Sequence, residues 1–215
     1  MITPDLVRAA LALPVPLPQL GTFIDVQKAR AAAVVVPLAF EPEPAAIVVL
    51  RGSHLHDHAG EVGFPGGKPD PVDPDLAATA LRELEEEVGV RASEVDLLGT
   101  LVPVPVITGR FLIHPFVGAL LRGAAPRVAS PEIARVLSLP ILPLLTGERP
   151  IFAMRGEFAG AMIFAPHFAL DGCVLYGASA YIFYELLARL AATLGWEMPE
   201  AEMQQEPPWG DRYKR

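Results

Sequence analysis

The chain has 215 residues, 52% of them hydrophobic, which is enough for one domain with a substantial apolar core. Its formal net charge of −8 argues against a nucleic-acid-binding protein, because phosphate backbones favour basic surfaces. No apolar run approaches the roughly 20 residues that span a membrane, and the lone Cys173 is compatible with a reducing compartment. We therefore expect a cytoplasmic protein that binds neither nucleic acid nor membrane. Its single domain should cover residues 1–198, followed by a polar tail from 199 that contains Trp209.

The first predicted elements are a helix and two strands. Thr3 and Pro4 are typical of the cap and the first position of a helix, which we place over residues 3–12. A proline-punctuated connection follows at 14–18. The apolar runs 31–40 and 45–51 are typical of strands, and the EPEP segment between them is typical of a turn.

The stretch 64–90, FPGGKPDPVDPDLAATALRELEEEVGV, opens with a Pro-Gly-Gly turn and then becomes helical. We expect Asp73 to cap this helix, Pro74 to occupy its first position and Gly89 to end it. At the helical period, one apolar stripe is formed by Ala77, Leu81, Leu84 and Val88.

Three acidic residues share another side of the same helix. Glu83, Glu86 and Glu87 fall together roughly opposite the apolar stripe, and like charges at this spacing repel one another. A hard divalent cation such as Mg²⁺ prefers carboxylate oxygens and often bridges them to phosphates. The alternative is a solvated acidic face. The pattern predicts a metal-binding helix.

The remainder of the chain mixes strands with a few helices. Strands are predicted at 95–102, 111–121, 151–154, 161–165 and 174–176, and a helix at 178–194. The sequence Ser130-Pro131-Glu132 predicts the start of a short helix. Such a mixture indicates an α/β fold in which helices cover both faces of a sheet.

The acidic helix also carries a known motif. Residues 82–90, RELEEEVGV, match the second half of the Nudix box, REUxEExGU, in which U is aliphatic, and Gly67 supplies the glycine of that box. Eight residues rather than seven separate Asp73 from Arg82, so Asp70 and Asp73 both remain candidates for the first acid of the pattern. On these residues the chain resembles the Nudix hydrolases.

The segment just upstream resembles one branch of that family. Residues 48–67, VVLRGSHLHDHAGEVGFPGG, are similar to the signature LLTxR(S/A)xxxRxxxGxxxFPGG of the coenzyme A pyrophosphatases. His56 replaces an arginine of the signature, and Arg51 sits one place from another. Segments 114–120, 131–142 and 174–182 also resemble the branch, so the resemblance spans roughly residues 31–190.

The resemblance implies a fold, a reaction and a site. The fold would be a Nudix-type α/β/α sandwich with a mixed sheet. The reaction would be the Mg²⁺- or Mn²⁺-dependent cleavage of coenzyme A or its derivatives into adenosine 3′,5′-bisphosphate and a phosphopantetheine. Glu83 and Glu87 would be the main metal ligands, and Gly67 would add its carbonyl. Glu86 would bind metal or position the attacking water, and Arg82 would hold Glu86 in place.

Other candidate residues have two interpretations each. Lys68, Arg51 and Arg110 are either phosphate contacts or ordinary surface residues. Glu132 is either a general base, as in some Nudix enzymes, or an acid at the start of a helix that is favoured by the helix dipole.

A cluster of histidines is a second candidate metal site. His54, His56 and His58 would share one side of an extended segment, and three imidazoles suit zinc. The alternative is a loop over the substrate mouth, with His58 matching the branch signature and His56 partly replacing the missing arginine as a hydrogen-bond donor.

Three functions remain open at this point. The first is a coenzyme A diphosphatase, and the second is a Nudix hydrolase for another substrate, such as ADP-ribose or a nucleoside triphosphate. The third is a weakly active domain that binds a nucleotide as a sensor, against which the complete set of three glutamates argues. A homodimer is also open, with the helix at 178–194 serving either an interface or the core.

Overall fold

A computed structural model describes residues 1–13, 26–158 and 161–207. The predicted connection at 14–18 and the part of the predicted tail with Trp209 lie outside these residues.

The helices are α1 (Pro4–Ala12), α2 (Leu76–Val88), α3 (Leu142–Leu145) and α4 (Gly177–Leu194), with one 3-10 turn, η1 (Ala92–Glu94). The strands are β1 (Arg30–Ala39), β2 (Ala45–Arg51), β3 (Val62–Gly63), β4 (Gly66–Gly67), β5 (Val95–Thr100), β6 (Val104–Pro105), β7 (Phe111–Leu120), β8 (Ile133–Pro140), β9 (Phe152–Phe158), β10 (Ala161–Leu170), β11 (Cys173–Leu175) and β12 (Glu202–Met203). Within the described residues, no helix is long and apolar enough to cross a membrane.

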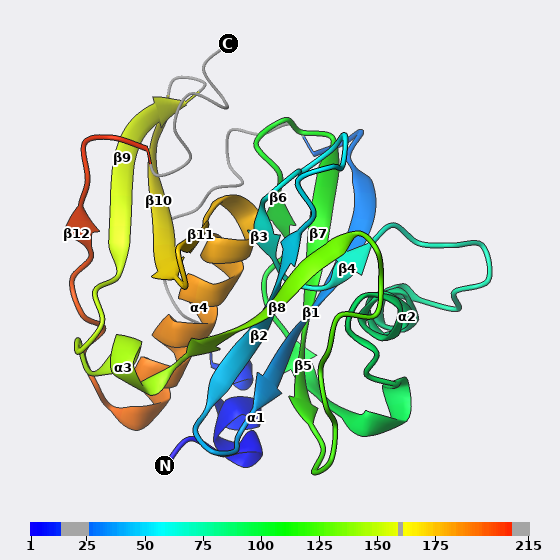
Figure 1. The fold of residues 1–215 in the computed structure, drawn as a ribbon. Coiled ribbons are helices and arrows are strands. Elements are labelled where there is room, and N and C mark those ends of the chain that lie inside the picture. The colour runs from blue at the N-terminus through cyan, green and yellow to red at the C-terminus, as the bar shows by residue number, and fades with distance from the viewer. Residues whose placement is uncertain (14–25, 159–160, 208–215) are drawn as a thin grey trace.

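The strands form a mixed sheet (Figure 1). β1 pairs in parallel with β7, starting with Arg30 opposite Phe111, whereas β5 pairs antiparallel with β7 and β8 pairs antiparallel with β2. At the other end, the β9–β10 hairpin follows β11, and β12 pairs with the outer side of β9. The first part of the predicted polar tail therefore contributes an edge strand.

One short segment separates the two central strands. β1 and β2 pair only near the turn that joins them, at Leu38 opposite Ala46 and Ala39 opposite Ala45. Beyond that point the segment 62–67 enters between them: β3 pairs with β2, and β4 pairs with β1. The Pro-Gly-Gly turn thus lies at a split in the sheet, between β1 and β2.

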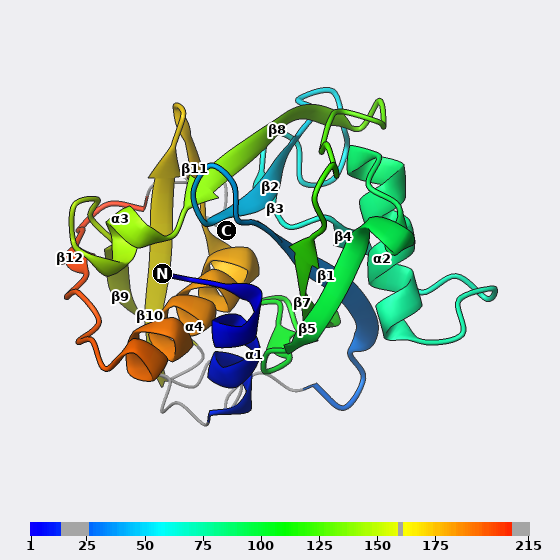
Figure 2. The same ribbon diagram turned by 90° about the horizontal axis from the view of Figure 1, so that it is seen from below.

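Helices cover both faces of this sheet, which confirms the predicted Nudix-type α/β/α sandwich (Figures 1 and 2). Along β1, Val34 and Val36 join the larger apolar cluster with α1 and α4, whereas Ala33 and Val35 join the smaller cluster with α2. Alternate residues of a strand face opposite sides, so a continuous apolar run fits a strand buried on both faces. Ten of the 18 residues of α4 are buried, so this helix contributes to the core.

The predicted helix at Ser130-Pro131-Glu132 is wrong. The chain instead enters β8 directly, which pairs with β2 along its length, and the buried Leu137 and Leu139 flank the exposed Ser138. This alternation has the period of a strand. The local signal for a helix start did not prevail, because the backbone N–H and C=O groups of this segment form their hydrogen bonds with β2 instead of within a helix.

Most other predicted elements are confirmed with shifted ends. The first helix is present, and Thr3 caps it by accepting a 3.3 Å hydrogen bond from the backbone N–H of Leu6. The strands expected at 151–154 and 161–165 are both longer, because they form an antiparallel hairpin in which each extends the other. The two-residue strands β3, β4, β6 and β12 were not predicted, since so short a segment has no measurable periodicity.

Candidate functional site

The acidic helix α2 begins two residues later than predicted. Asp75, not Asp73, is its cap, and its carboxylate accepts a 2.8 Å hydrogen bond from the backbone N–H of Ala78. Pro74 therefore lies before the cap and not in the first turn. Gly89 ends the helix as predicted, with a left-handed φ of 67° that glycine adopts without strain.

The helix packs on the sheet through a stripe that differs in one member from the prediction. Ala80, Leu84 and Val88 are fully buried against the sheet, and the partly buried Leu81 packs against them as predicted. Ala77 is partly buried and does not belong to this cluster. The three fully buried residues are spaced four apart and so lie along one face. Anchoring this face leaves the glutamates at the border between the sheet and solvent.

Asp73 has a different role from the predicted cap. Its two carboxylate oxygens accept hydrogen bonds of 3.0 Å from Nε and Nη2 of Arg82, and one of them also accepts a 2.9 Å bond from the Thr79 hydroxyl. The hydrogen bonds from Arg82 hold the pKa of Asp73 far below its usual range. Such a two-point contact fixes both position and orientation of the guanidinium. Asp70, the other candidate acid, instead accepts a 3.1 Å bond from the backbone N–H of Val72.

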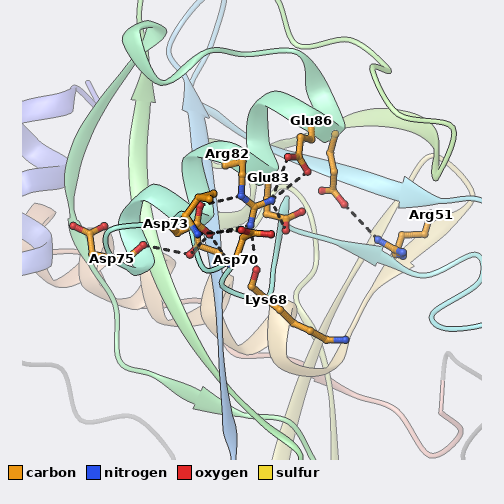
Figure 3. A network of polar contacts seen from close by, with 11 residues as sticks. Arg51, Lys68, Asp70, Asp73, Asp75, Arg82, Glu83 and Glu86 are labelled. Carbon is orange, nitrogen blue, oxygen red and sulfur yellow. Dashed lines mark hydrogen bonds and ion pairs between the residues drawn. The ribbon is translucent and has the colours of Figure 1, made fainter.

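Arg82 is the centre of the polar network in Figure 3. Its Nη1 donates to Glu83 at 3.0 Å and to Glu86 at 3.2 Å, so the predicted contact with Glu86 is present. Its Nη2 donates to the backbone carbonyl of Lys68 at 3.1 Å. One guanidinium therefore joins the loop after the Pro-Gly-Gly turn to two of the three predicted metal ligands.

The Gly66-Gly67 turn lies directly against this network. A Cβ atom at Gly67 would lie 2.2 Å from Oε1 of Glu83, and one at Gly66 would lie 2.3 Å from the carbonyl oxygen of Ala33. At Gly66 the obstructing atom belongs to the backbone, so a side chain is excluded there, whereas at Gly67 a side chain would have to displace the Glu83 carboxylate. The glycines allow the backbone of β4 to approach the Glu83 carboxylate closely.

Glu87 is the most buried of the three glutamates. It is 6% exposed, and burial raises the pKa of Glu87 to about 7, while the Arg51 charge opposes that rise. Nη1 of Arg51 donates to Oε1 of Glu87 at 3.3 Å, and Nη2 of Arg51 donates to Glu132 at 2.8 Å. Arg51 thus joins the last turn of α2 to the residue that precedes β8.

The donor set suits a hard divalent cation. Oε2 of Glu87 is buried with no hydrogen-bond partner among the described residues, and Glu83 is largely buried while Glu86 is exposed. In the present side-chain positions of the described residues, no three acidic, histidine or cysteine groups converge as a metal site, since Arg82 and Arg51 hold the carboxylates. The residues fit the cation by chemistry, with the two arginines balancing their charge.

The remaining predicted site residues are dispersed around this network. Lys68 follows the turn, and its ammonium lies 5.5 Å from the centre of the Phe111 ring. Arg110 is exposed beside Phe111, and its backbone carbonyl accepts a 3.0 Å bond from the N–H of Arg30. The ring contact was not predicted from the sequence, because Lys68 and Phe111 are far apart in the chain.

The histidine segment forms an exposed loop after β2. His56 is 99% exposed and contacts Asp57 at 3.1 Å, whereas His58 contacts Glu61 at 2.7 Å. This contact with Glu61 raises the pKa of His58. Together with His54, these side chains do not converge as a metal site among the described residues, so the structure gives the zinc interpretation no support.

The family described as NUDIX domain matches residues 28–152, a span that includes β1, the split in the sheet, the whole of α2 and β8. The chain belongs to the NUDIX domain family. Residues 82–90, which carry Arg82 and the three glutamates, lie within this span, as does Gly67.

Two curated relatives carry the name uncharacterized Nudix hydrolase NudL. The one from Yersinia enterocolitica is 41% identical over 132 residues, covering 61% of this chain and 66% of the relative. The one from Escherichia coli O1:K1 is 39% identical over 112 residues, covering 52% and 58%. The chain thus matches about six tenths of these relatives' length.

Among solved structures, the MutT protein from Methanosarcina mazei Go1 is 15% identical with a TM-score of 0.48, covering 77% of this chain and 96% of that one.

Proposed function

We propose that this Nudix domain hydrolyses the diphosphate linkage of coenzyme A or its derivatives, releasing adenosine 3′,5′-bisphosphate and a phosphopantetheine. The observation that carries the proposal is the continuity of segment 48–67, which resembles the coenzyme A branch, with the acidic helix. Arg51 from this segment contacts Glu87, and Gly67 contacts Glu83. The segment that resembles the branch therefore borders the candidate metal ligands directly.

The metal would be Mg²⁺ or Mn²⁺, held by Glu83, Glu86 and Glu87 with the carbonyl of Gly67. When bound, such a cation polarises phosphoryl oxygens and acidifies water. Arg82 keeps the Glu83 and Glu86 carboxylates beside the turn, through its own anchor on Asp73. Groups that orient metal ligands in this way preserve metal affinity.

Glu132 is the proposed general base. It is exposed, and Arg51 holds its carboxylate at 2.8 Å while also contacting Glu87. An exposed carboxylate fixed beside the metal helix can accept a proton from a water molecule. Its alternative explanation as a helix-start acid no longer applies, because Glu132 precedes a strand.

The phosphate contacts are proposed to come from two sides of the turn. Arg51 and Lys68 flank the acidic helix, and Arg110 adds a further exposed cation. His56 and His58 come from the loop whose residues 53 and 56–61 line an open hollow of about 560 Å³. His56 would donate a single hydrogen bond where an arginine donates two.

Product analysis tests the substrate. Pure protein is incubated with coenzyme A, ADP-ribose and a nucleoside triphosphate, each with Mg²⁺ or Mn²⁺. Release of adenosine 3′,5′-bisphosphate from coenzyme A is expected. Cleavage of ADP-ribose alone would reassign the upstream segment to another substrate, and the absence of metal-dependent cleavage would favour a nucleotide sensor.

A matched pair of variants tests the site. Glu86→Gln should lower kcat at least about a hundredfold, because a ligand or water-positioning carboxylate is lost. Glu85→Gln is the control, because Glu85 is exposed on the same helix and its substitution removes the same charge. Mn²⁺ binding followed by electron paramagnetic resonance provides a readout that does not depend on turnover. Equal activity in the two variants would contradict the assignment of Glu86.

The partner is proposed to be a small nucleotide and neither nucleic acid nor membrane, in a cytoplasmic protein of net charge −8. A homodimer is retained as a proposal, although α4 is buried within the chain. Sedimentation velocity at several concentrations would show whether a dimer forms.

A further inference from the structure

Two cationic side chains lie over the ring of Phe111, the first residue of β7. The guanidinium carbon of Arg30 lies 4.6 Å from the ring centre, and Nζ of Lys68 lies 5.5 Å from it. Both distances are within the range of a cation–π contact. The same ring therefore holds two positive charges within cation–π distance of its centre.

The pairing of three strands brings these residues together. Arg30 and Phe111 are opposite each other in the parallel pair of β1 and β7, so their side chains share a face of the sheet. β4 runs antiparallel to β1 with Gly67 opposite Ala33, and the chain therefore continues from Gly67 through Lys68 toward Arg30. The cluster of Arg30, Lys68 and Phe111 is thus a consequence of strand register.

The charges of this cluster are not balanced within the described part of the chain. Arg30 and Lys68 are exposed, and neither forms an ion pair with a carboxylate of the described residues. Two like charges held on one ring repel each other, so an anion that contacts both would be stabilised. The cluster is suited to an anionic ligand although the chain as a whole is acidic.

The cluster begins one residue from the candidate metal site. Gly67 lies against the Glu83 carboxylate, and the carbonyl of Lys68 accepts a hydrogen bond from Arg82. The Lys68 side chain points away from the acidic residues (Figure 3). A nucleotide whose diphosphate faces α2 could therefore present a second phosphate to Arg30 and Lys68.

We propose that Arg30 and Lys68, held by Phe111, bind a phosphate monoester on the ribose of the substrate, separate from the diphosphate that is cleaved. The identity of this group as the 3′-phosphate rests on the proposed coenzyme A function. A phosphate monoester carries nearly two negative charges at neutral pH, which matches two cations. ADP-ribose carries no such monoester, so the cluster would favour coenzyme A over ADP-ribose.

Equilibrium binding without metal tests this subsite independently of hydrolysis. Isothermal titration calorimetry in EDTA compares adenosine 3′,5′-bisphosphate with adenosine 5′-monophosphate, which differ only in the monoester. The wild-type chain should bind the bisphosphate more tightly. Arg30→Gln and Lys68→Gln should each weaken bisphosphate binding about tenfold and change monophosphate binding less than about twofold.

Two further variants separate the subsite from general charge and from folding. Phe111→Leu keeps an apolar side chain and should weaken bisphosphate binding about threefold, because only the cation–π contacts are lost. Arg122→Gln is the charge control, since Arg122 is exposed just beyond the other end of β7 and should leave both affinities unchanged.

Several results would overturn the subsite: equal wild-type affinity for the two nucleotides, unchanged binding in both cation variants, or an equal loss for both nucleotides. The last result would assign the cations to the 5′-phosphate. If the protein fails to cleave coenzyme A while the bisphosphate preference and its loss are observed, the subsite stands and the proposed substrate falls. Failure of the two proposals is therefore distinguishable.

Discussion

At the scale of single residues, the lack of a side chain at Gly67 is as important as any charged group. Glu83 occupies the place where a Cβ of residue 67 would lie. Because the obstructing atoms belong to the end of a flexible side chain, a larger residue at 67 would displace the carboxylate and leave the backbone in place. The glycine thus protects the arrangement of the metal ligands more than the stability of the fold.

Gly67→Ala tests this distinction. We expect Mn²⁺ affinity to fall about tenfold, as for other changes that misplace a metal ligand, while the free energy of unfolding changes by less than about 1 kcal/mol. The two measurements are calorimetric titration and urea unfolding. Gly156→Ala in β9 is the matched control, because a Cβ there meets nothing within 4 Å. Wild-type metal affinity in Gly67→Ala would contradict this role.

The pair of His58 and Glu61 gives a prediction for pH. Since Glu61 raises the pKa of His58, stability from this contact is fully present below the pKa of an unfolded histidine and is lost as pH rises through the higher folded value. Following the ring protons of His58 by NMR against pH should give a pKa above that of a histidine peptide, and Glu61→Gln should lower it. A pKa below the peptide value would disprove the contact.

At the scale of the element, two acids near the start of α2 have separate tasks. Asp75 caps the helix, whereas Asp73 holds Arg82. They stand two residues apart and are chemically identical, so sequence spacing does not distinguish them. Their substitutions should affect different properties of the protein.

Asp75→Ala should lower the free energy of unfolding by about 1 kcal/mol, the usual cost of a lost cap, and leave metal affinity unchanged. Urea unfolding and Mn²⁺ titration give the two quantities. A large loss of metal affinity in this variant would show that Asp75 also positions the glutamates.

Asp73→Asn should lower Mn²⁺ affinity about tenfold, because Arg82 loses its two-point contact and no longer fixes Glu83 and Glu86. Metal titration of this variant beside Asp75→Ala provides the comparison. If only Asp75→Ala reduced metal affinity, the roles assigned to the two acids would be reversed.

At the scale of the whole molecule, a buried ion pair joins elements from distant parts of the chain. Glu185 and Arg189 on α4 are almost fully buried, and Arg189 donates to Glu185 at 2.7 Å. Arg189 also donates to the carbonyl of Leu11 in the last turn of α1 and to that of Leu13 just after it, and Glu185 accepts from the N–H of Val102. The pair thus ties α1 and the segment just after β5 to α4.

Glu185→Gln should lower the free energy of unfolding by about 3 kcal/mol, since it leaves a buried guanidinium without its countercharge. Urea unfolding measures the change, and the exposed Glu197→Gln is the control. A loss equal to that of the control would show that the pair contributes nothing beyond its packing.

Features that depend only on residues close together in the chain could be predicted from the sequence alone. Gly89 marked the end of α2, and apolar runs marked β1 and β2. These predictions succeed because backbone periodicity is set within a few residues. Glu87 departs from the acidic face predicted opposite the apolar stripe, because it is buried like Leu84 and Val88. The same local signals misplaced the cap at Asp73 by two residues, since several acids there could serve equally.

Contacts between distant segments were decided by the fold. Strand pairing made β8 a strand against its local start signal, and it brought Glu132 to Arg51, 81 positions away. It likewise placed Arg30 and Lys68 on the ring of Phe111. Each residue type was visible in the sequence, but which charges meet depends on the register of paired strands, a property that no local pattern encodes.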